Sequence, residues 1–210
     1  MTNSKSTKRA LIISVLAIFM CVAMLIGTTF AWFTDTASTG VNKIQAGNLD
    51  VKLMYSTDMQ TWKEATEQTK LFDDNALWEP GYTQVVYLKV VNAGNLALKY
   101  ETGFSKNYTS NRGKNVNDDW YRVDNYLKIG TAETATKFAN REDVWSAIAA
   151  TEKTLAKDVM LTDGWITLNA GQESAPFAVA IYMPTSVGNE ANASRLRPSS
   201  VSGLGIEVRA

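Results

Sequence analysis

The sequence predicts an all-β fold, an antiparallel jelly-roll sandwich with an inserted helix, preceded by an N-terminal signal helix. Three observations support this prediction. Several short segments alternate between apolar and polar residues, turn-forming residues separate them, and the 210-residue length suits one sizeable domain. The predicted division is a signal peptide over 1–31, an N-terminal tail over 32–47 and a jelly-roll domain over 48–210.

The N-terminus has the three parts of a secretory signal peptide. Three basic residues lie among the first nine positions, and an almost entirely apolar run follows over residues 10–27. Thr29-Phe30-Ala31 then matches the small-x-small pattern of a cleavage site, which predicts a mature chain that begins at Trp32. The run is also close to the length that spans a bilayer, so an uncleaved anchor is the alternative. Contact with a membrane is expected only through this uncleaved segment.

A polar tail of small residues separates the apolar run from the first expected strand. We expect the start of this tail to be a donor strand, which leaves its own domain and adds to a sheet edge of the next subunit. The candidate donor residues are Trp32, Phe33, Thr34, Asp35, Thr36, Ala37, Ser38, Thr39 and Gly40. They suit a strand, have no strong apolar face, and become a free N-terminus only after cleavage. The alternative is a linker that lets the peptidase reach its site.

The rest of the chain predicts strands separated by turns and interrupted by one helix. Strands are expected over 48–55, 83–91, 96–100, 120–129, 165–168, 177–183 and 203–210, with a long polar loop over 107–119. The helix is expected over 140–157, because Asn140 is a good N-cap and acidic residues follow it. The strand alternation places these side chains in the core: Leu49, Val51, Leu53, Val86, Leu88, Val90, Leu96, Leu98, Val179, Ile181, Ile206 and Val208.

The composition argues against an enzyme. The chain has no histidine, which excludes an H-E-x-x-H zinc site and both Ser-His-Asp and Cys-His arrangements. Its single cysteine, Cys21, lies in the apolar run, and no Ser-x-x-Lys pattern occurs. We therefore predict no catalytic, cofactor-binding or metal-binding residues and no cofactor. The acidic pairs Asp73-Asp74 and Asp118-Asp119 are expected in solvated loops, and weak calcium binding over 115–119 is the alternative.

The net charge and the distribution of the tryptophans indicate which kinds of partner the chain can bind. The chain has 21 basic and 21 acidic residues, and cleavage after Ala31 leaves 18 basic residues and all 21 acidic ones. This balance predicts no nucleic-acid partner. Six tryptophans are spread over different segments, so we expect most of them in the core, with Trp32 and Trp62 exposed. A sugar-stacking face is the alternative.

Four segments in order carry a family resemblance: FAWFTDTAS, IQAGNLDVKL, LWEPGYTQVVYLKVVNAGNLALKY and YMPTSVGNEAN. Together they resemble the camelysin/TasA family of exported proteins of Gram-positive bacteria. The resemblance implies a jelly-roll subunit that self-associates into extracellular biofilm-matrix fibres. It also implies processing by a signal peptidase of the SipW type, and it leaves open an accessory matrix protein as a further partner.

The sequence thus predicts a secreted structural subunit of the extracellular matrix or cell surface, which polymerises head-to-tail by donating its N-terminal strand. Camelysin-type members of the family are classed as metallopeptidases, so a cell-surface peptidase is one alternative, although the missing histidines argue against it. A monomeric surface adhesin is the other alternative.

Overall fold

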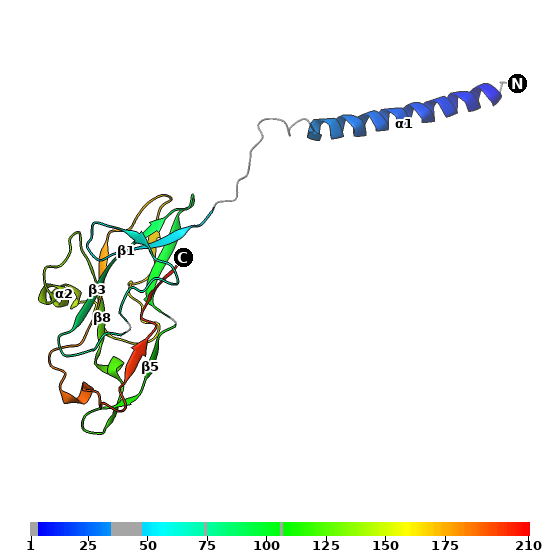
Figure 1. The fold of residues 1–210 in the computed structure, drawn as a ribbon. Coiled ribbons are helices and arrows are strands. Elements are labelled where there is room, and N and C mark those ends of the chain that lie inside the picture. Colours follow the sequence, from blue (N-terminus) through cyan, green and yellow to red (C-terminus); the bar gives the residue numbers. More distant parts are fainter. Residues whose placement is uncertain (1–3, 35–47, 74, 106) are drawn as a thin grey trace. The chain divides into compact units, whose positions relative to one another are not determined.

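The computed structural model describes residues 4–34, 48–73, 75–105 and 107–210, and for residues 4–6 and 23–34 it describes the backbone alone (Figure 1). The chain divides into two units, residues 1–46 and 47–210. The first unit contains helix α1 (Ser4–Thr34), whose side chains over residues 7–22 are exposed.

Within the described ranges, no helix combines the length and the apolar character needed to cross a membrane.

The second unit is mostly β-structure arranged in antiparallel sheets, as the all-β prediction expects. Its strands are β1 (Val51–Ser56), β2 (Lys63–Glu64), β3 (Thr83–Asn92), β4 (Leu98–Phe104), β5 (Thr109–Asn111), β6 (Gly113–Lys114), β7 (Trp120–Tyr121), β8 (Lys128–Glu133), β9 (Lys153–Thr154), β10 (Ile166–Leu168), β11 (Phe177–Tyr182), β12 (Ser200–Ser202) and β13 (Ile206–Arg209). Its helices are η1 (Val123–Tyr126), α2 (Arg141–Ile148) and η2 (Asn189–Ala191).

The largest sheet has six strands in the order β2-β1-β3-β11-β8-β9, and a three-stranded sheet has the order β10-β4-β13. Two further pairs, β12-β5 and β6-β7, are short ladders. The centre of the large sheet is the pairing of β3 with β11, in which Val86 lies opposite Val179. Runs of β-branched and aromatic residues favour these two strands, which are the most regular parts of the sequence pattern.

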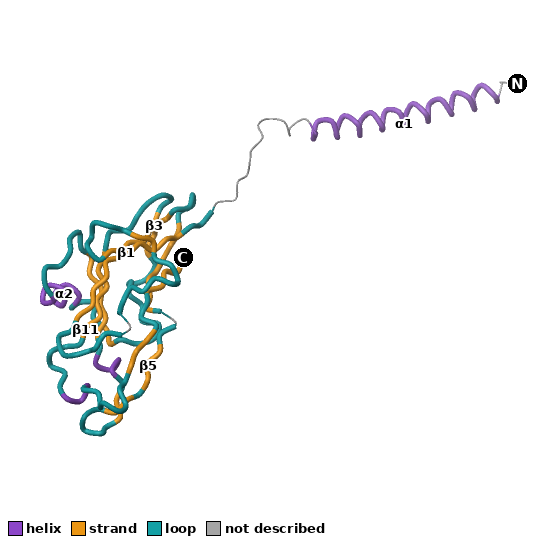
Figure 2. The backbone as a smooth tube through the Cα atoms, viewed as in Figure 1, coloured by secondary structure: helices purple, strands orange, loops and turns teal. Residues whose placement is uncertain are grey.

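The main hydrophobic cluster joins one face of the large sheet to the smaller one. It combines Leu88, Ile129 and Ile181 of the large sheet with Phe104 of β4, and all four side chains are fully buried. Helix α2 covers the opposite face, where Ile148 packs with Ala180 and Tyr182 of β11 (Figure 2). Small residues let α2 approach closely, because a side chain at Gly130 would meet Ile148 Cβ at 2.9 Å.

Six of the twelve predicted core residues are buried, four are half-buried and two are exposed. Val86, Leu88, Val90, Leu98, Val179 and Ile181 are buried, while Val51, Leu53, Ile206 and Val208 are half-buried. The prediction is wrong for Leu49 and Leu96, whose side chains are 59% and 46% exposed. Both precede their strands, since β1 begins at Val51 and β4 at Leu98. The alternation of apolar and polar residues therefore continues outside strands β1 and β4, where the side chains are not buried.

The predicted helix begins where expected but is shorter. The Asn140 side chain accepts a hydrogen bond from the Asp143 N–H at 2.9 Å, which confirms the N-cap. Helix α2 ends at Ile148 rather than at 157. The Thr151 hydroxyl donates to the Thr131 carbonyl at 2.6 Å and accepts from the Thr131 N–H at 2.9 Å. This tertiary contact with β8 turns the chain into β9 and ends the helix.

The segment predicted as one strand over 120–129 is divided into β7, η1 and the start of β8, and the predicted loop over 107–119 contains β5 and β6. Asp124 explains the break after β7. Its buried carboxylate accepts a hydrogen bond from the Ser110 hydroxyl at 2.7 Å, and the turn η1 places it there. A buried carboxylate needs such a donor, so this contact overrides the strand pattern.

The turn after β1 is organised by the exposed carboxylate of Asp58. One carboxylate oxygen accepts hydrogen bonds from the Thr61 N–H, the Gln60 N–H and the Ser56 hydroxyl, each at 2.8 Å. These bonds hold the pKa of Asp58 well below its usual range. A depressed pKa in the folded state gives stability that is present above the unfolded pKa of about 4 and is lost as pH falls through the folded pKa.

We therefore expect Asp58→Asn to lose part of the acid dependence of stability. Urea unfolding between about pH 5 and pH 2 should show a shallower decline for Asp58→Asn than for the unaltered protein, because the amide cannot be protonated in this range. Equal declines for the two proteins would show that Asp58 does not contribute.

Candidate functional site

The residues predicted at the cleavage site and the start of the donor strand lie in α1. Its backbone is helical through Thr29, Ala31 and Trp32 and continues over Phe33 to Thr34. The helix thus extends three residues beyond the predicted cleavage point. The remaining donor candidates, residues 35–40, lie outside the described residues, as does most of the tail that was expected over 32–47.

A groove of about 1040 Å³ opens between the two main sheets of the second unit. Strand β8 lines it with residues 131–133, and β10 lines it with residues 166–168. The last turn of α2 and the residues just after it add Ala147 and Ala150, and the segment before β11 adds residues 173–175. The groove therefore collects short segments that are far apart in the sequence.

Each long wall of the groove is an edge strand or the end of one. Among the described strands, β10 pairs with β4 alone, so its other edge has no ladder. Strand β9 pairs with β8 only at Lys128 and Ile129, and the rest of that edge has no strand partner in the described part of the chain. Unpaired N–H and C=O groups on such edges are suited to receive another strand. On β8, the N–H and C=O of Thr131 already bond to the Thr151 hydroxyl, so an added strand there would have to displace this side chain.

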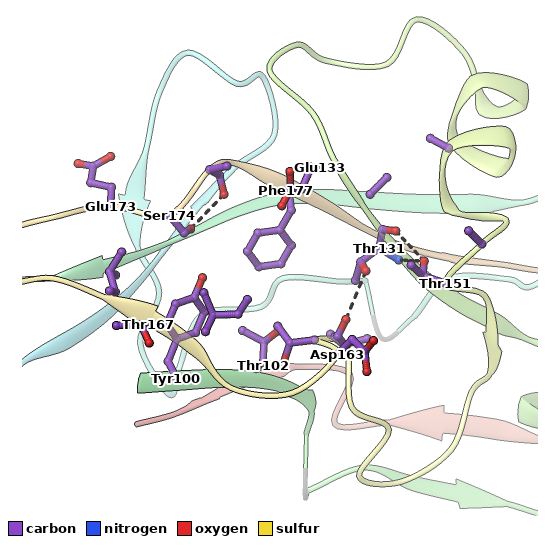
Figure 3. Close-up of a pocket in the computed structure, with 18 of the residues that line it drawn as sticks. Tyr100, Thr102, Thr131, Glu133, Thr151, Asp163, Thr167, Glu173, Ser174 and Phe177 are labelled. Carbon is purple, nitrogen blue, oxygen red and sulfur yellow. Dashed lines mark hydrogen bonds between the residues drawn. The ribbon is translucent and has the colours of Figure 1, made fainter. Parts of the chain in front are cut away.

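The floor of the groove is mostly apolar, with a few polar groups. Figure 3 shows the Phe177 ring between the walls, above Tyr100 and Thr102. Burial raises the pKa of the Tyr100 phenol, so this side chain stays neutral at physiological pH. The Thr102 hydroxyl is fully buried and has no hydrogen-bond partner among the described residues. A buried hydroxyl without a partner costs free energy that an added donor or acceptor would recover.

Two hydrogen bonds fix the segments that line the groove. The Thr131 hydroxyl donates to the Leu161 carbonyl at 3.4 Å across the groove (Figure 3), and β3 holds β10 through the Asn92 side-chain amide, which donates to the Leu168 carbonyl at 3.1 Å. The first bond is the one that joins the two sides of the groove. This bond is long and weak, so it holds the walls together only loosely.

Several polar side chains of the groove have structural partners. The hydroxyls of Thr131 and Thr151 donate to backbone carbonyls, Lys153 Nζ donates to the Met160 carbonyl at 2.7 Å, and Glu173 pairs with Lys89 at 2.5 Å. In the described ranges, no three His, Cys, Asp or Glu side chains are grouped as metal ligands. This geometry suits the holding of an extended chain by its backbone and apolar side chains.

The described members of the acidic pairs are exposed, as predicted. Asp73, Asp118 and Asp119 are exposed, while Asp74 lies outside the described residues. The segment considered for calcium is a turn organised by the buried Asn115. Its side-chain oxygen accepts hydrogen bonds from the N–H groups of residues 117 and 119 at 3.0 and 2.9 Å. Backbone N–H groups therefore already occupy the side-chain oxygen of Asn115.

The prediction that most tryptophans fill the core is wrong. Of the five whose side chains are described, Trp62, Trp78 and Trp145 are half-buried, and Trp120 and Trp165 are 53% and 56% exposed. Trp62, which was expected to be exposed, is half-buried, and Lys89 Nζ lies 5.0 Å from the centre of its ring. The side chain of Trp32 is not among those described.

Sequence reasoning did not find the groove. Its walls come from β8 and β10, which pair with strands distant in the sequence, and β10 has only three residues. The polar Thr-rich pattern of residues 131–136 and the small residues that follow α2 were the available signals, and neither specifies a groove by itself.

The fold defines a mostly β chain with antiparallel sheets and a separate N-terminal helix. Comparison of the chain with models of protein families, with curated proteins and with solved structures finds no match. The resemblance to the camelysin/TasA family therefore stays a prediction.

Proposed function

We propose that this chain is an exported structural subunit that polymerises head-to-tail into extracellular matrix fibres of the camelysin/TasA kind. In the proposed contact, residues 32–40 of one subunit lie as an added strand in the groove of the next. The observation that carries the proposal is the groove itself, which is bounded by the edge of β10 that has no ladder among the described strands and by the end of β8 beyond its short pairing with β9. For the fold, we propose a jelly-roll sandwich with the main cluster between its sheets.

The chemistry of the segment suits the groove. Nine extended residues span roughly 30 Å, and their side chains alternate between two faces. One face would contact the floor around Phe177, and the backbone would pair with a wall. An entering strand would replace the weak bond between Thr131 and Leu161 with ladder hydrogen bonds. Because donor and acceptor are different surfaces, the contact is heterologous and produces filaments.

Cleavage by a SipW-type signal peptidase would act as the switch. Residues 32–34 form the end of α1, where the N–H groups bond to carbonyls one turn earlier in the helix while the last carbonyls have no partner within it. These residues become available for a sheet only when the helix ends. Removal of residues 1–31 takes away the segment that maintains the helix and creates the free end that threading requires.

We predict that the secreted protein begins at Trp32. Edman sequencing or intact-mass measurement of protein from the culture medium should give this N-terminus, because Thr29 and Ala31 present the small residues that a signal peptidase accepts. A start many residues later, or full-length protein found only in membranes, would contradict the assignment.

The function is tested with purified protein that comprises residues 32–210. Electron microscopy should show fibres, and incubation with casein and added divalent metals should give no cleavage. A persistent monomer contradicts the fibre proposal. Cleavage by the pure protein that a chelator abolishes would favour the camelysin-type peptidase instead.

A further inference from the structure

A cluster of cations surrounds the exposed ring of Trp120, which is not among the residues that line the groove. The centre of the ring lies 5.0 Å from Arg112 Cζ, 5.4 Å from Lys114 Nζ and 6.0 Å from Arg197 Cζ. Trp120 is 53% exposed and begins β7, the second strand of the β6-β7 ladder. Three cations around one ring need an explanation, since they also repel one another.

The backbone holds these groups together. The Lys114 N–H donates to the Arg197 carbonyl at 2.8 Å, and the Ser194 N–H donates to the Lys114 carbonyl at 2.7 Å. Gly113 permits this contact, because a Cβ there would lie 2.2 Å from the Ser199 nitrogen. The segment 194–199 is therefore hydrogen-bonded along β6. This arrangement holds the three cations near the Trp120 ring before any ligand binds.

Only one of the three charges is neutralised. Lys114 Nζ pairs with Asp118 at 2.6 Å. Arg112 and Arg197 are exposed, and neither forms an ion pair with a carboxylate in the described part of the chain. In contrast, Arg141, which lies over Trp145, pairs with Glu142 at 2.9 Å. The Trp120 cluster thus keeps two guanidinium groups available to an external anion.

We propose that the Trp120 cluster binds an acidic polysaccharide. A guanidinium group recognises a carboxylate through two parallel hydrogen bonds, and an exposed indole face packs against the C–H face of a sugar ring. A uronic acid unit offers both features on one residue. The site is independent of fibre formation and goes beyond the proposed function.

The surroundings favour this ligand over a single-stranded nucleic acid. A phosphodiester chain needs a continuous basic track, with a cation for each successive phosphate. Here the exposed carboxylates of Asp118 and Asp119 follow on the same turn, and Glu190 lies on the adjoining segment, where its pKa is lowered by hydrogen bonds from the N–H groups of Gly188 and Glu190. These negative charges restrict the positively charged surface to an area that suits one anionic group and its immediate neighbours.

The test uses protein comprising residues 32–210 and three probes: polygalacturonate, its fully methyl-esterified form and oligo(dT). We expect calorimetry to detect binding of polygalacturonate that weakens with added salt, and no binding of the neutral ester. The variants Trp120→Ala and Arg112→Gln/Arg197→Gln should each weaken this binding by about tenfold. The control Trp165→Ala removes a second tryptophan that is exposed in the described part of the chain, and it should change the affinity less than about twofold.

Four outcomes would overturn the proposal. They are no binding of polygalacturonate, equal binding of the ester, tighter binding of oligo(dT), and an equal loss of affinity in Trp165→Ala. Circular dichroism confirms that each variant is folded, which is expected because the changed side chains are exposed. Fibre formation is measured separately, so failure of this proposal and failure of the fibre proposal are distinguishable.

Discussion

Protein that starts at Asn42 instead of Trp32 is expected to fold normally and to form no fibres. The truncation removes the candidate donor strand, residues 32–40, and leaves the whole of the second unit, residues 47–210, intact. The groove between β8 and β10 then has no strand to receive, so head-to-tail addition stops. Circular dichroism should match that of the longer protein, while electron microscopy and light scattering should show no filaments.

A synthetic peptide of residues 32–41 provides the complementary experiment. Added to protein that starts at Trp32, it should occupy the groove and stop fibre growth at substoichiometric amounts relative to total subunits, because each fibre has one growing acceptor end. A scrambled peptide of the same composition is the control. If the truncated protein polymerises as fast as the longer one, the tail is only a linker.

The acceptor side is tested by filling the groove. Ala150 is exposed and lines the groove, whereas its neighbour Ala149 is exposed and does not line it. Ala150→Trp should slow fibre growth by occupying the space of the strand, and Ala149→Trp should leave the rate unchanged. Equal rates for these two variants would place the acceptor site elsewhere on the molecule.

The sequence predicted the elements whose pattern is long and regular. The β3 segment is rich in β-branched and aromatic residues over its ten positions and β11 is continuously apolar, so local composition alone identifies both strands. Their pairing was not predictable, because β3 and β11 are separated by more than eighty residues and nothing local encodes the register that places Val86 opposite Val179.

The errors arose where tertiary contacts override a local pattern. Thr151 bonds to β8 and ends a helix that propensity would extend. The buried Asp124 bends a segment with strand composition. Trp120 lies exposed among Arg112, which lies just before β6, and Arg197, from a distant part of the chain, so an aromatic residue expected in the core is a surface feature. The groove depends on such contacts and could not be predicted.

Leu88→Ala is expected to destabilise the second unit by about 2–5 kcal/mol. Leu88 is fully buried, belongs to the main cluster, and lies opposite Tyr55 on β1 and Phe177 on β11. Removal of its branched end leaves a cavity between two neighbouring strands whose positions are fixed by their ladders, so the surroundings relax only in part. Urea unfolding followed by tryptophan fluorescence should show a lower midpoint with an unchanged slope.

Leu96→Ala is the matched control, because the same alternation predicts both leucines to be buried and the structure exposes Leu96 by 46%. It should change the free energy of unfolding by less than about 0.5 kcal/mol, as surface substitutions usually do. Comparison of the two variants separates a leucine that is buried within a strand from one that only the sequence pattern predicts to be buried. Equal losses in both variants would mean that the turn between β3 and β4 is packed in solution, and an unchanged Leu88→Ala midpoint would mean that the phase of β3 is wrong.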